Sequence, residues 1–136
     1  MMPKFLLDTN VVSEPIKPKP NNTLMKRLKQ HEDELAISAV VWHELNYGCN
    51  RLPASKKRDS ITLYLAAIDW LILPYDADAA HWHAAERARL TELGRTPSFQ
   101  DGQIAAVAAT QDLILVTFNL DDFTDFKGLK LADWRH

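Results

Sequence analysis

The segment Phe5-Leu6-Leu7-Asp8-Thr9-Asn10 places a short apolar run immediately before an aspartate. Three consecutive apolar residues are typical of a strand that is buried on both of its faces. The clearest strand pattern in the chain is Leu113-Ile114-Leu115-Val116-Thr117, which is again apolar on both faces. Leu35-Ala36-Ile37 is a shorter run of the same kind, and Leu129-Lys130-Leu131 is a further strand candidate. Strands without polar alternation predict a mostly parallel sheet that is covered on both sides.

Segments with helical patterns separate these strands, as the α/β class requires. The proline-rich stretch Pro15–Asn22 is predicted to be a loop, because its prolines exclude helix. Helices are predicted over residues 23–30, 39–49, 55–70, 78–93 and 97–109, several of them after a Ser or Thr that can cap the first turn. With 136 residues the chain has the length of one domain, and we expect a single domain over residues 1–136.

Composition limits the function classes. The net charge is −2, so a protein that binds RNA must here rely on a local basic patch or on a bound metal ion. Cys49 is the only cysteine, which excludes an internal disulfide and suits a reducing compartment. No apolar run approaches the roughly 20 residues of a spanning helix. These features predict a cytoplasmic protein without a membrane partner.

Polar side chains stand where the two clearest strands end. Asp8 directly follows the first strand, and Asn119 and Asp122 follow the strand at 113–117. In parallel sheets, ligands bind outside the carboxyl ends of the strands. The alternative interpretation is local, because Asp and Asn side chains at these places also form turns with the next backbone amides.

Two further acids lie on predicted helices. Glu44 is on or beside the apolar stripe of its helix, where an ionised carboxylate needs a cationic partner unless it is solvated at the margin. Asp101 is the third residue after Ser98, an arrangement that also serves as a helix cap. The helix that continues through Ile104–Ala109 is so apolar that its start must lie at the edge of the interior.

Taken together, the acids predict a metal site. Carboxylates from two strand ends and two helices that met in one crevice would repel each other unless a cation neutralised them. Mg²⁺ prefers oxygen ligands and keeps several waters. Such a site suits hydrolysis of a phosphodiester, in which the metal polarises a phosphoryl oxygen and activates water.

Four segments resemble, in order, the motifs of PIN-domain ribonucleases, in particular the VapC toxins and their FitB-like relatives. They are Leu6–Val12, Ser38–Leu45, Asp101–Ala106 and Thr117–Phe123, and Leu131–Trp134 resembles the C-terminal strand of that family. The resemblance implies a three-layer α/β/α sandwich on a mostly parallel sheet of four or five strands.

The resemblance also implies an activity and a set of site residues. The activity is that of a metal-dependent endoribonuclease with Mg²⁺ or Mn²⁺, the toxic component of a type II toxin–antitoxin pair. Its catalytic and metal-binding residues would be Asp8, Glu44, Asp101 and Asp122, and its substrate-positioning residues Thr9, Asn10, Thr117 and Asn119. One position departs from the family pattern: Phe118 stands where relatives often carry an arginine that can contact phosphate.

The implied partners are an RNA substrate, a VapB-like antitoxin and a second copy of the chain. We expect an antitoxin Arg or Lys to enter the acidic crevice, and its apolar anchors to lie on helices near Leu24, Leu28 and Leu52. The basic run at 56–58 is either a solvated helix start or, with Lys26, Arg27 and Lys29, part of an RNA-contacting rim.

Two other functions remain open at this point. A phosphatase of the haloacid-dehalogenase kind also begins with an apolar strand and an aspartate, but its chemistry needs a second aspartate where this chain has Asn10, and a lysine near the site. A PIN-like module that binds RNA or a protein without cleaving is the non-enzymatic alternative. Missing acids would be its usual sign, and none of the three principal acids is missing.

Overall fold

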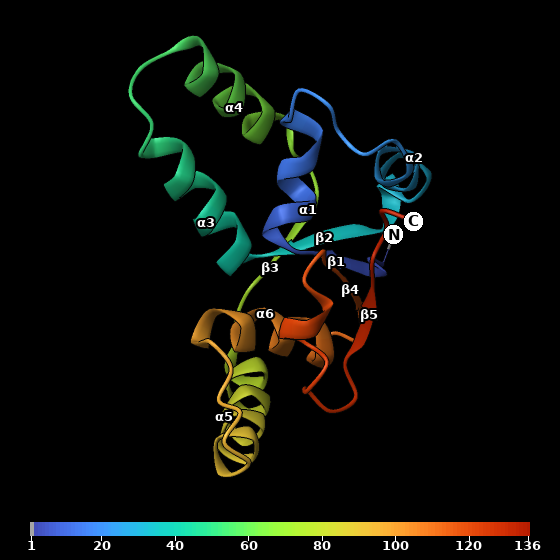
Figure 1. The fold of residues 1–136 in the computed structure, drawn as a ribbon, viewed down its shortest axis with the longest axis vertical. Coiled ribbons are helices and arrows are strands. Elements are labelled where there is room, and N and C mark those ends of the chain that lie inside the picture. The colour runs from blue at the N-terminus through green and yellow to red at the C-terminus, as the bar shows by residue number, and fades with distance from the viewer. Residues whose placement is uncertain (1) are drawn as a thin grey trace.

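A computed structural model describes residues 2–136, and its centre is one five-stranded sheet (Figure 1). The strands are β1 (Phe5–Leu7), β2 (Leu35–Ser38), β3 (Leu71–Leu73), β4 (Ile114–Val116) and β5 (Lys130–Ala132). They are hydrogen-bonded in the order β3-β2-β1-β4-β5, and every pair is parallel. The α/β class predicted from the sequence is confirmed.

The connections between strands place helices on both faces of this sheet. From β1 to β3 the chain moves towards one edge through α1 (Thr9–Ser13), α2 (Asn22–Gln30), α3 (Ala39–Asn50) and α4 (Lys56–Ala67). It returns from β3 to β4 through α5 (Ala77–Glu92) and α6 (Phe99–Thr110). Because parallel crossovers are right-handed, reversing the direction puts the second group of helices on the opposite face. Figure 1 shows α1–α4 on one side of the sheet and α5 and α6 on the other.

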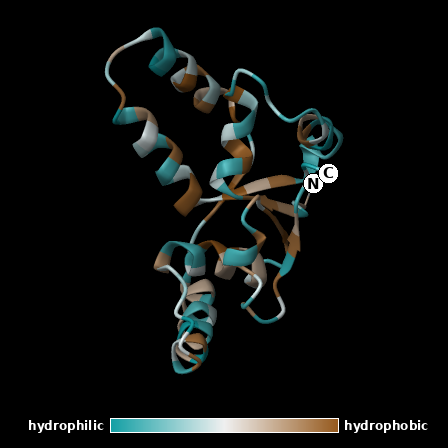
Figure 2. Ribbon diagram, in the orientation of Figure 1, coloured by the Kyte–Doolittle hydropathy of each residue, from teal (hydrophilic) through white to brown (hydrophobic). Residues whose placement is uncertain are grey.

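Apolar side chains of the three inner strands and of α6 form the core. Every residue of β1 and β2 is buried, and α6 buries an unbroken run from Ile104 to Ala108. Figure 2 shows the hydrophobic residues on the strands and on the helix faces turned towards them. A helix of this composition is stable only inside a protein, so the start of α6 is held at the edge of the interior, as the sequence predicted.

The prediction that Leu24 and Leu28 offer an exposed surface to a partner is wrong. Both side chains are buried in the core, at 0% and 8% exposure. They stand four residues apart on α2, so they share the face that packs on the protein, while its charged residues face outward. Leu52 is half-buried.

Other differences from the predicted elements are local. Helix α4 ends at Ala67 rather than at Trp70, because Ile68 turns into extended backbone and leads to the edge strand β3. The short helix α1 was not predicted, although Asp8 caps it as the turn interpretation requires. Three 3-10 turns complete the chain: η1 (Glu14–Ile16), η2 (Glu32–Glu34) and η3 (Leu120–Asp122).

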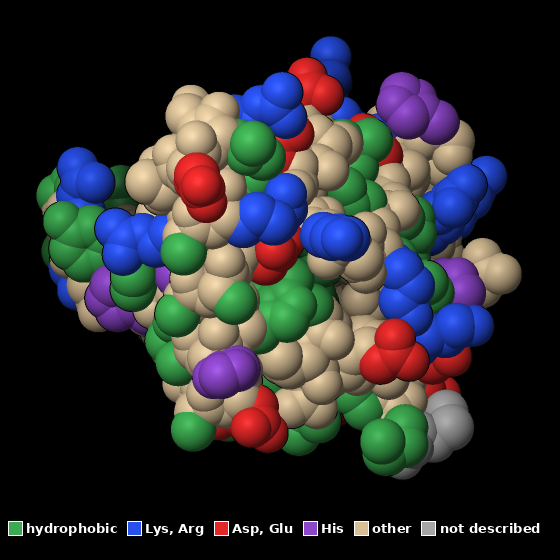
Figure 3. All heavy atoms as spheres, turned by 90° about the horizontal axis from the view of Figure 1, so that it is seen from below, with side chains coloured by type: hydrophobic (Ala, Val, Ile, Leu, Met, Phe, Trp, Pro, Cys, Tyr) green, Lys and Arg blue, Asp and Glu red, His purple; other side chains and the backbone are tan. Residues whose placement is uncertain are grey.

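The strand order defines where a ligand site belongs. The direction of the chain reverses between β1 and β4, and a crevice forms outside the carboxyl ends at such a switch point. Figure 3 shows a different face, on which positive and negative side chains alternate without a large patch of one sign. Within residues 2–136 no helix has the length and apolarity needed to cross a membrane.

Candidate active site

Asp8 and Thr117 join the two strands at the switch point. Asp8 is 8% exposed, and its two carboxylate oxygens accept hydrogen bonds from the Thr9 amide and from the Thr117 hydroxyl, each at 2.8 Å. The Thr117 side chain is fully buried, and its oxygen also accepts the Asn119 amide at 3.0 Å. One hydroxyl therefore fixes the first carboxylate and the loop after β4 at the same time.

The charges of nearby aspartates act on Asp8 and on Asp101. Burial raises the pKa of the Asp8 carboxyl, the bonds from Thr117 and Thr9 oppose this, and the negative charge of Asp122 raises it further. Burial also raises the pKa of Asp101, against the hydrogen bond with Ser98, and the charges of Asp122 and Asp8 add to the rise. Asp8 at the end of β1, Asp101 on α6 and Asp122 in η3 therefore lie near one another.

Glu44 lies beside these aspartates rather than in contact with them. Its carboxylate is 34% exposed and has the His43 ring nitrogen Nδ1 3.5 Å away. Glu44 lines one hollow together with Thr9, at the start of α1, and a second together with Gln100 and Gln103, which flank Asp101 on α6. It thus stands between the helices that carry the other acids, at the mouth of the site.

The remaining predicted residues surround Asp8 in different ways. Asn10 lies on α1, and its side-chain oxygen accepts the Phe118 amide at 3.5 Å. Asn119 and Asp122 are exposed at the surface of the loop after β4. Phe118, which replaces the arginine of the family pattern, has an arginine beside it: the Arg135 guanidinium lies 4.3 Å from its ring centre and donates a hydrogen bond to its carbonyl. Arg135 also forms an ion pair with Asp133 at 2.6 Å, which neutralises its charge.

The donor set fits a hard divalent cation. Burial and the negative charge of neighbouring aspartates raise the pKa of Asp8 and of Asp101, and no Lys or Arg contributes to either shift. Among residues 2–136, the Thr9 hydroxyl and His83 Nε2 are the buried side-chain atoms that lack a hydrogen-bond partner, and Thr9 adjoins Asp8. Within residues 2–136, no group of three His, Cys, Asp or Glu side chains is arranged so that it could hold a metal ion by itself. Mg²⁺ does not need one, because it binds through one or two carboxylates and keeps its waters.

The contact between Gly102 and the His83 ring fixes the turn of α6 that carries Asp101. His83 on α5 is 1% exposed, with its Nδ1 hydrogen-bonded to the Tyr75 hydroxyl at 2.8 Å and its ring 4.8 Å from that of Phe99. A Cβ atom on residue 102 would overlap the His83 ring. The first turn of α6 therefore sits directly on a buried imidazole. His83 faces α6, whereas His81, two residues before it on the same helix, is exposed.

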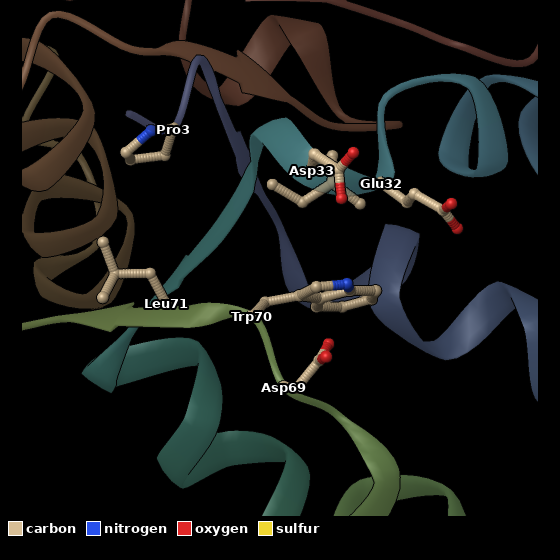
Figure 4. A pocket seen from close by; sticks show the side chains of 7 residues that line it. Pro3, Glu32, Asp33, Asp69, Trp70 and Leu71 are labelled. Carbon is tan, nitrogen blue, oxygen red and sulfur yellow. The ribbon is translucent and has the colours of Figure 1, made fainter. Parts of the chain in front are cut away.

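A further hollow, of about 480 Å³, lies at the edge of the sheet opposite to the candidate site (Figure 4). Glu32, Asp33 and Asp69 lie around the Trp70 ring there, with Pro3 and Leu71 beyond. All three acids are exposed, and the hollow opens at the amino ends of the strands. It lacks the buried, mutually interacting carboxylates of the switch point, so we do not place the chemistry there.

The basic residues do not form the joint rim that the sequence left open. Figure 1 shows α2 and the start of α4 on different sides of the molecule. Arg27 donates to the His136 carbonyl at 2.8 Å, so it holds the C-terminal residues rather than lining the crevice. Gln100 and Gln103, two neutral side chains at the mouth of the site, were not predicted to belong to it. Their spacing around Asp101 on one helix is the pattern in the sequence that indicates them.

Comparison with known proteins places the chain in a family. The PIN domain model matches residues 5–129. A VapC from Shigella flexneri, named as a tRNA(fMet)-specific endonuclease, is 34% identical over 134 residues, which are 98% of this chain and 99% of that protein. Toxin FitB of Neisseria gonorrhoeae is 32% identical over 125 residues, 88% of this chain and 90% of that one.

Solved structures agree with these relatives. The FitAcB complex from Neisseria gonorrhoeae superposes with a TM-score of 0.89 at 29% identity and covers 97% of this chain and 99% of that one. The DNA-bound VapBC of Salmonella typhimurium gives a TM-score of 0.82 at 29% identity and covers 98% and 99%. The chain belongs to the PIN-domain family, in the branch that holds the VapC and FitB toxins.

Proposed function

We propose that this protein is a metal-dependent endoribonuclease and the toxin of a toxin–antitoxin pair in the bacterial cytoplasm. The observation that carries the proposal is that burial and the charge of Asp122 raise the pKa of Asp8, while burial and the charges of Asp122 and Asp8 raise the pKa of Asp101, with no cationic side chain to offset them. A transfer RNA is the first substrate to test, because the Shigella flexneri relative is named for cleaving one.

The chain's own residues would hold and orient the reacting groups. Bound Mg²⁺ or Mn²⁺ supplies the positive charge that a phosphodiester needs at this place and activates water. Asp8, Asp101 and Asp122 would hold the ion, with Glu44 at its open side. Thr117 keeps the Asp8 carboxylate oriented through its 2.8 Å hydrogen bond. Thr9, Asn10 and Asn119 would position the RNA backbone around the site.

An antitoxin is the proposed protein partner, since related solved structures are FitAB and VapBC complexes. A hollow of about 250 Å³ between α1, α3 and α4 offers apolar anchoring at Ile16, Leu45 and Ile61 and reaches Glu44. An Arg or Lys of the partner could pair there with the carboxylates and occupy the place of the metal's charge. We also propose that the toxin acts as a homodimer.

The test of the nuclease is Asp8→Asn, which keeps the shape of the side chain and removes its charge. We expect RNA cleavage with Mg²⁺ to fall below detection. Without metal, the variant should melt at the same temperature as the wild type or higher, because one repelling carboxylate is gone. Glu32→Gln, an exposed acid of the opposite hollow, is the matched control and should cleave normally. Cleavage at the wild-type rate by Asp8→Asn would contradict the assignment, and RNA binding without cleavage by the wild type would favour the non-enzymatic alternative.

The inhibition mechanism has its own test. The chain is purified with its antitoxin, and the Arg and Lys residues of the partner's toxin-binding segment are changed to Ala. We expect inhibition of cleavage to be lost while apolar contacts retain much of the affinity. Full inhibition by a segment without any Arg or Lys would show that charge substitution is not the mechanism.

A further inference from the structure

The outer face of α3 carries a ladder of flat side chains, formed by His43, Tyr47 and Arg51. They follow one another at intervals of four residues, so they stand one above the next along the helix. The rings of His43 and Tyr47 are stacked with centres 6.0 Å apart and an angle of 16° between their planes. The Arg51 guanidinium lies 5.6 Å from the centre of the Tyr47 ring.

This ladder begins at the mouth of the candidate active site. His43 is the neighbour of Glu44, and the two carry atoms 3.5 Å apart. Both line a groove of about 410 Å³ between α3 and α6, whose other wall is formed by Gln100 and Gln103 beside Asp101. A chain that leaves the carboxylates through this groove therefore meets His43 first, then Tyr47, then Arg51.

The fold itself has no need of the ladder. The His43 side chain is 72% exposed and Tyr47 is 52% exposed, while α3 packs on the protein through Val41, Leu45 and Cys49 on its other face. Contacts between side chains that remain in water contribute little to stability. Three solvated groups with parallel or facing planes instead offer open π surfaces and a fixed positive charge to a ligand.

We propose that the ladder of His43, Tyr47 and Arg51 is a stacking platform for single-stranded RNA on one side of the scissile phosphate. This inference rests on the nuclease function proposed above and adds the path of the substrate. Unstacked bases bind to aromatic rings and to guanidinium planes, and proteins that hold single strands combine such stacking with positive charge along the backbone. A molecule with net charge −2 has particular need of such contacts.

Positive charge follows the ladder at its far end. Lys56 and Lys57, both exposed, begin α4 a few residues after Arg51. A strand of RNA stacked on the ladder would extend towards this pair, which can bind its phosphates. Along this surface the carboxylates of the site come first, the ladder second and the two lysines third. In the same order, they would cleave the RNA, stack its bases and bind its phosphates.

Binding is measured on the Asp8→Asn protein, without metal, by the fluorescence anisotropy of a labelled single-stranded RNA. Tyr47→Ala should weaken binding roughly ten-fold, the loss expected when one base loses its aromatic partner. Tyr47→Phe keeps the ring and should bind as tightly as its parent. Leu93→Ala removes a similarly exposed apolar side chain from the end of α5 and is the control for surface area. A fully paired RNA duplex, whose bases are already stacked, should bind to Tyr47→Ala as tightly as it binds to the parent protein.

Three outcomes would overturn the platform. Single-stranded RNA bound by Tyr47→Ala within two-fold of its parent, with an unchanged circular dichroism spectrum, would exclude stacking on Tyr47. An equal loss for duplex and single strand would point to charge alone. A change from dimer to monomer in light scattering, with RNA affinity unchanged, would assign this face to a second copy of the chain. Ladder-dependent binding by a wild type that cleaves no RNA would instead contradict the nuclease and leave the platform standing.

Discussion

Thr117 shows how one neutral side chain can control the protonation of a catalytic-site carboxylate. Its hydroxyl lowers the pKa of Asp8, against the rise caused by burial. Thr117→Val keeps the volume and removes that donor, so the pKa of Asp8 must rise further. A carboxyl has to be deprotonated to bind a metal ion, and we expect the acidic limb of the pH–rate profile with Mg²⁺ to move to higher pH.

Thr117→Ser is the matched control, since it retains the hydroxyl. It should keep the wild-type profile, and the free energy of unfolding should fall by about 1–3 kcal/mol in Thr117→Val only. A Val variant with an unshifted acidic limb would mean that the 2.8 Å bond does not control Asp8.

A pair of glycines on two helices tests the packing behind Asp101. In Gly102→Ala the new methyl group overlaps the buried His83 ring, and overpacking of this kind costs about 1–3 kcal/mol of unfolding free energy. Gly48→Ala is the control, because nothing lies within 4 Å of its Cβ position and alanine favours helix by about 0.5–1 kcal/mol. Urea denaturation should therefore give opposite signs for the two variants. The His83→Ala background should remove most of the cost of Gly102→Ala, and an unchanged cost there would refute the contact.

The sequence singled out the acids that we propose for the site, but not the contacts that hold them. Asp8 and Asp101 were recognisable because each stands next to an apolar segment. Thr117 was expected only to position substrate; that its hydroxyl binds Asp8, 109 positions away in the chain, follows from strand pairing that no local pattern contains. The burial of Glu14 was not foreseen for the same reason: its carboxylate accepts the Asn21 amide at 2.8 Å and so closes the proline-rich loop.

At the scale of elements, Glu86 connects α5 to the loop before β5. Its carboxylate accepts hydrogen bonds from the Nε and Nη2 atoms of Arg89, at 2.8 and 2.9 Å, and from the Lys127 amide at 2.6 Å. These bonds, above all that from Arg89, hold the pKa of Glu86 below its usual value. A carboxyl with a lowered pKa in the folded state stabilises the protein above its unfolded pKa, and this contribution is lost as the pH falls through the folded pKa.

The corresponding variant is Glu86→Gln. It should lower the free energy of unfolding by about 1–3 kcal/mol at neutral pH, and the difference from wild type should vanish as the pH falls through the lowered pKa of Glu86 in the folded protein. Urea denaturation across this range measures it, with Glu92→Gln on the exposed side of the same helix as control. A difference independent of pH would show that shape rather than charge makes the contact.

Element types were easier to predict than element ends. The inner strands and the long helices follow from runs of apolar residues, which burial alone determines. The end of α4 at Ala67 and the five-residue helix α1 depend on how the chain turns into its neighbours. The prediction that Leu24 and Leu28 of α2 contact a partner was wrong for a related reason. An amphipathic pattern shows that the two residues share a face of the helix, but not whether the protein's own core or a partner covers that face.

At the scale of the whole molecule, Trp134 ties the C-terminal segment to the first strand. It is 3% exposed, packs edge-on against Phe5 with ring centres 4.8 Å apart, and stacks on His31 at 5.2 Å. Trp134→Ala should cost about 3–5 kcal/mol of unfolding free energy, measured by urea denaturation. Trp70→Ala, at the half-buried rim of the opposite hollow, should cost clearly less. Equal losses would mean that the C-terminal segment does not close the sheet.

The position of β1 between β2 and β4 has a consequence for synthesis on the ribosome. The first strand is made almost at once, but its partner β4 and the loop with Asp122 come from the last quarter of the chain. Chains emerge at about 5–20 residues per second and fold as their partners become available. A nascent chain thus exposes Asp8 with neither Thr117 nor Asp101 beside it. On the site proposed above, we expect the nuclease to be inert until the last strands have left the ribosome.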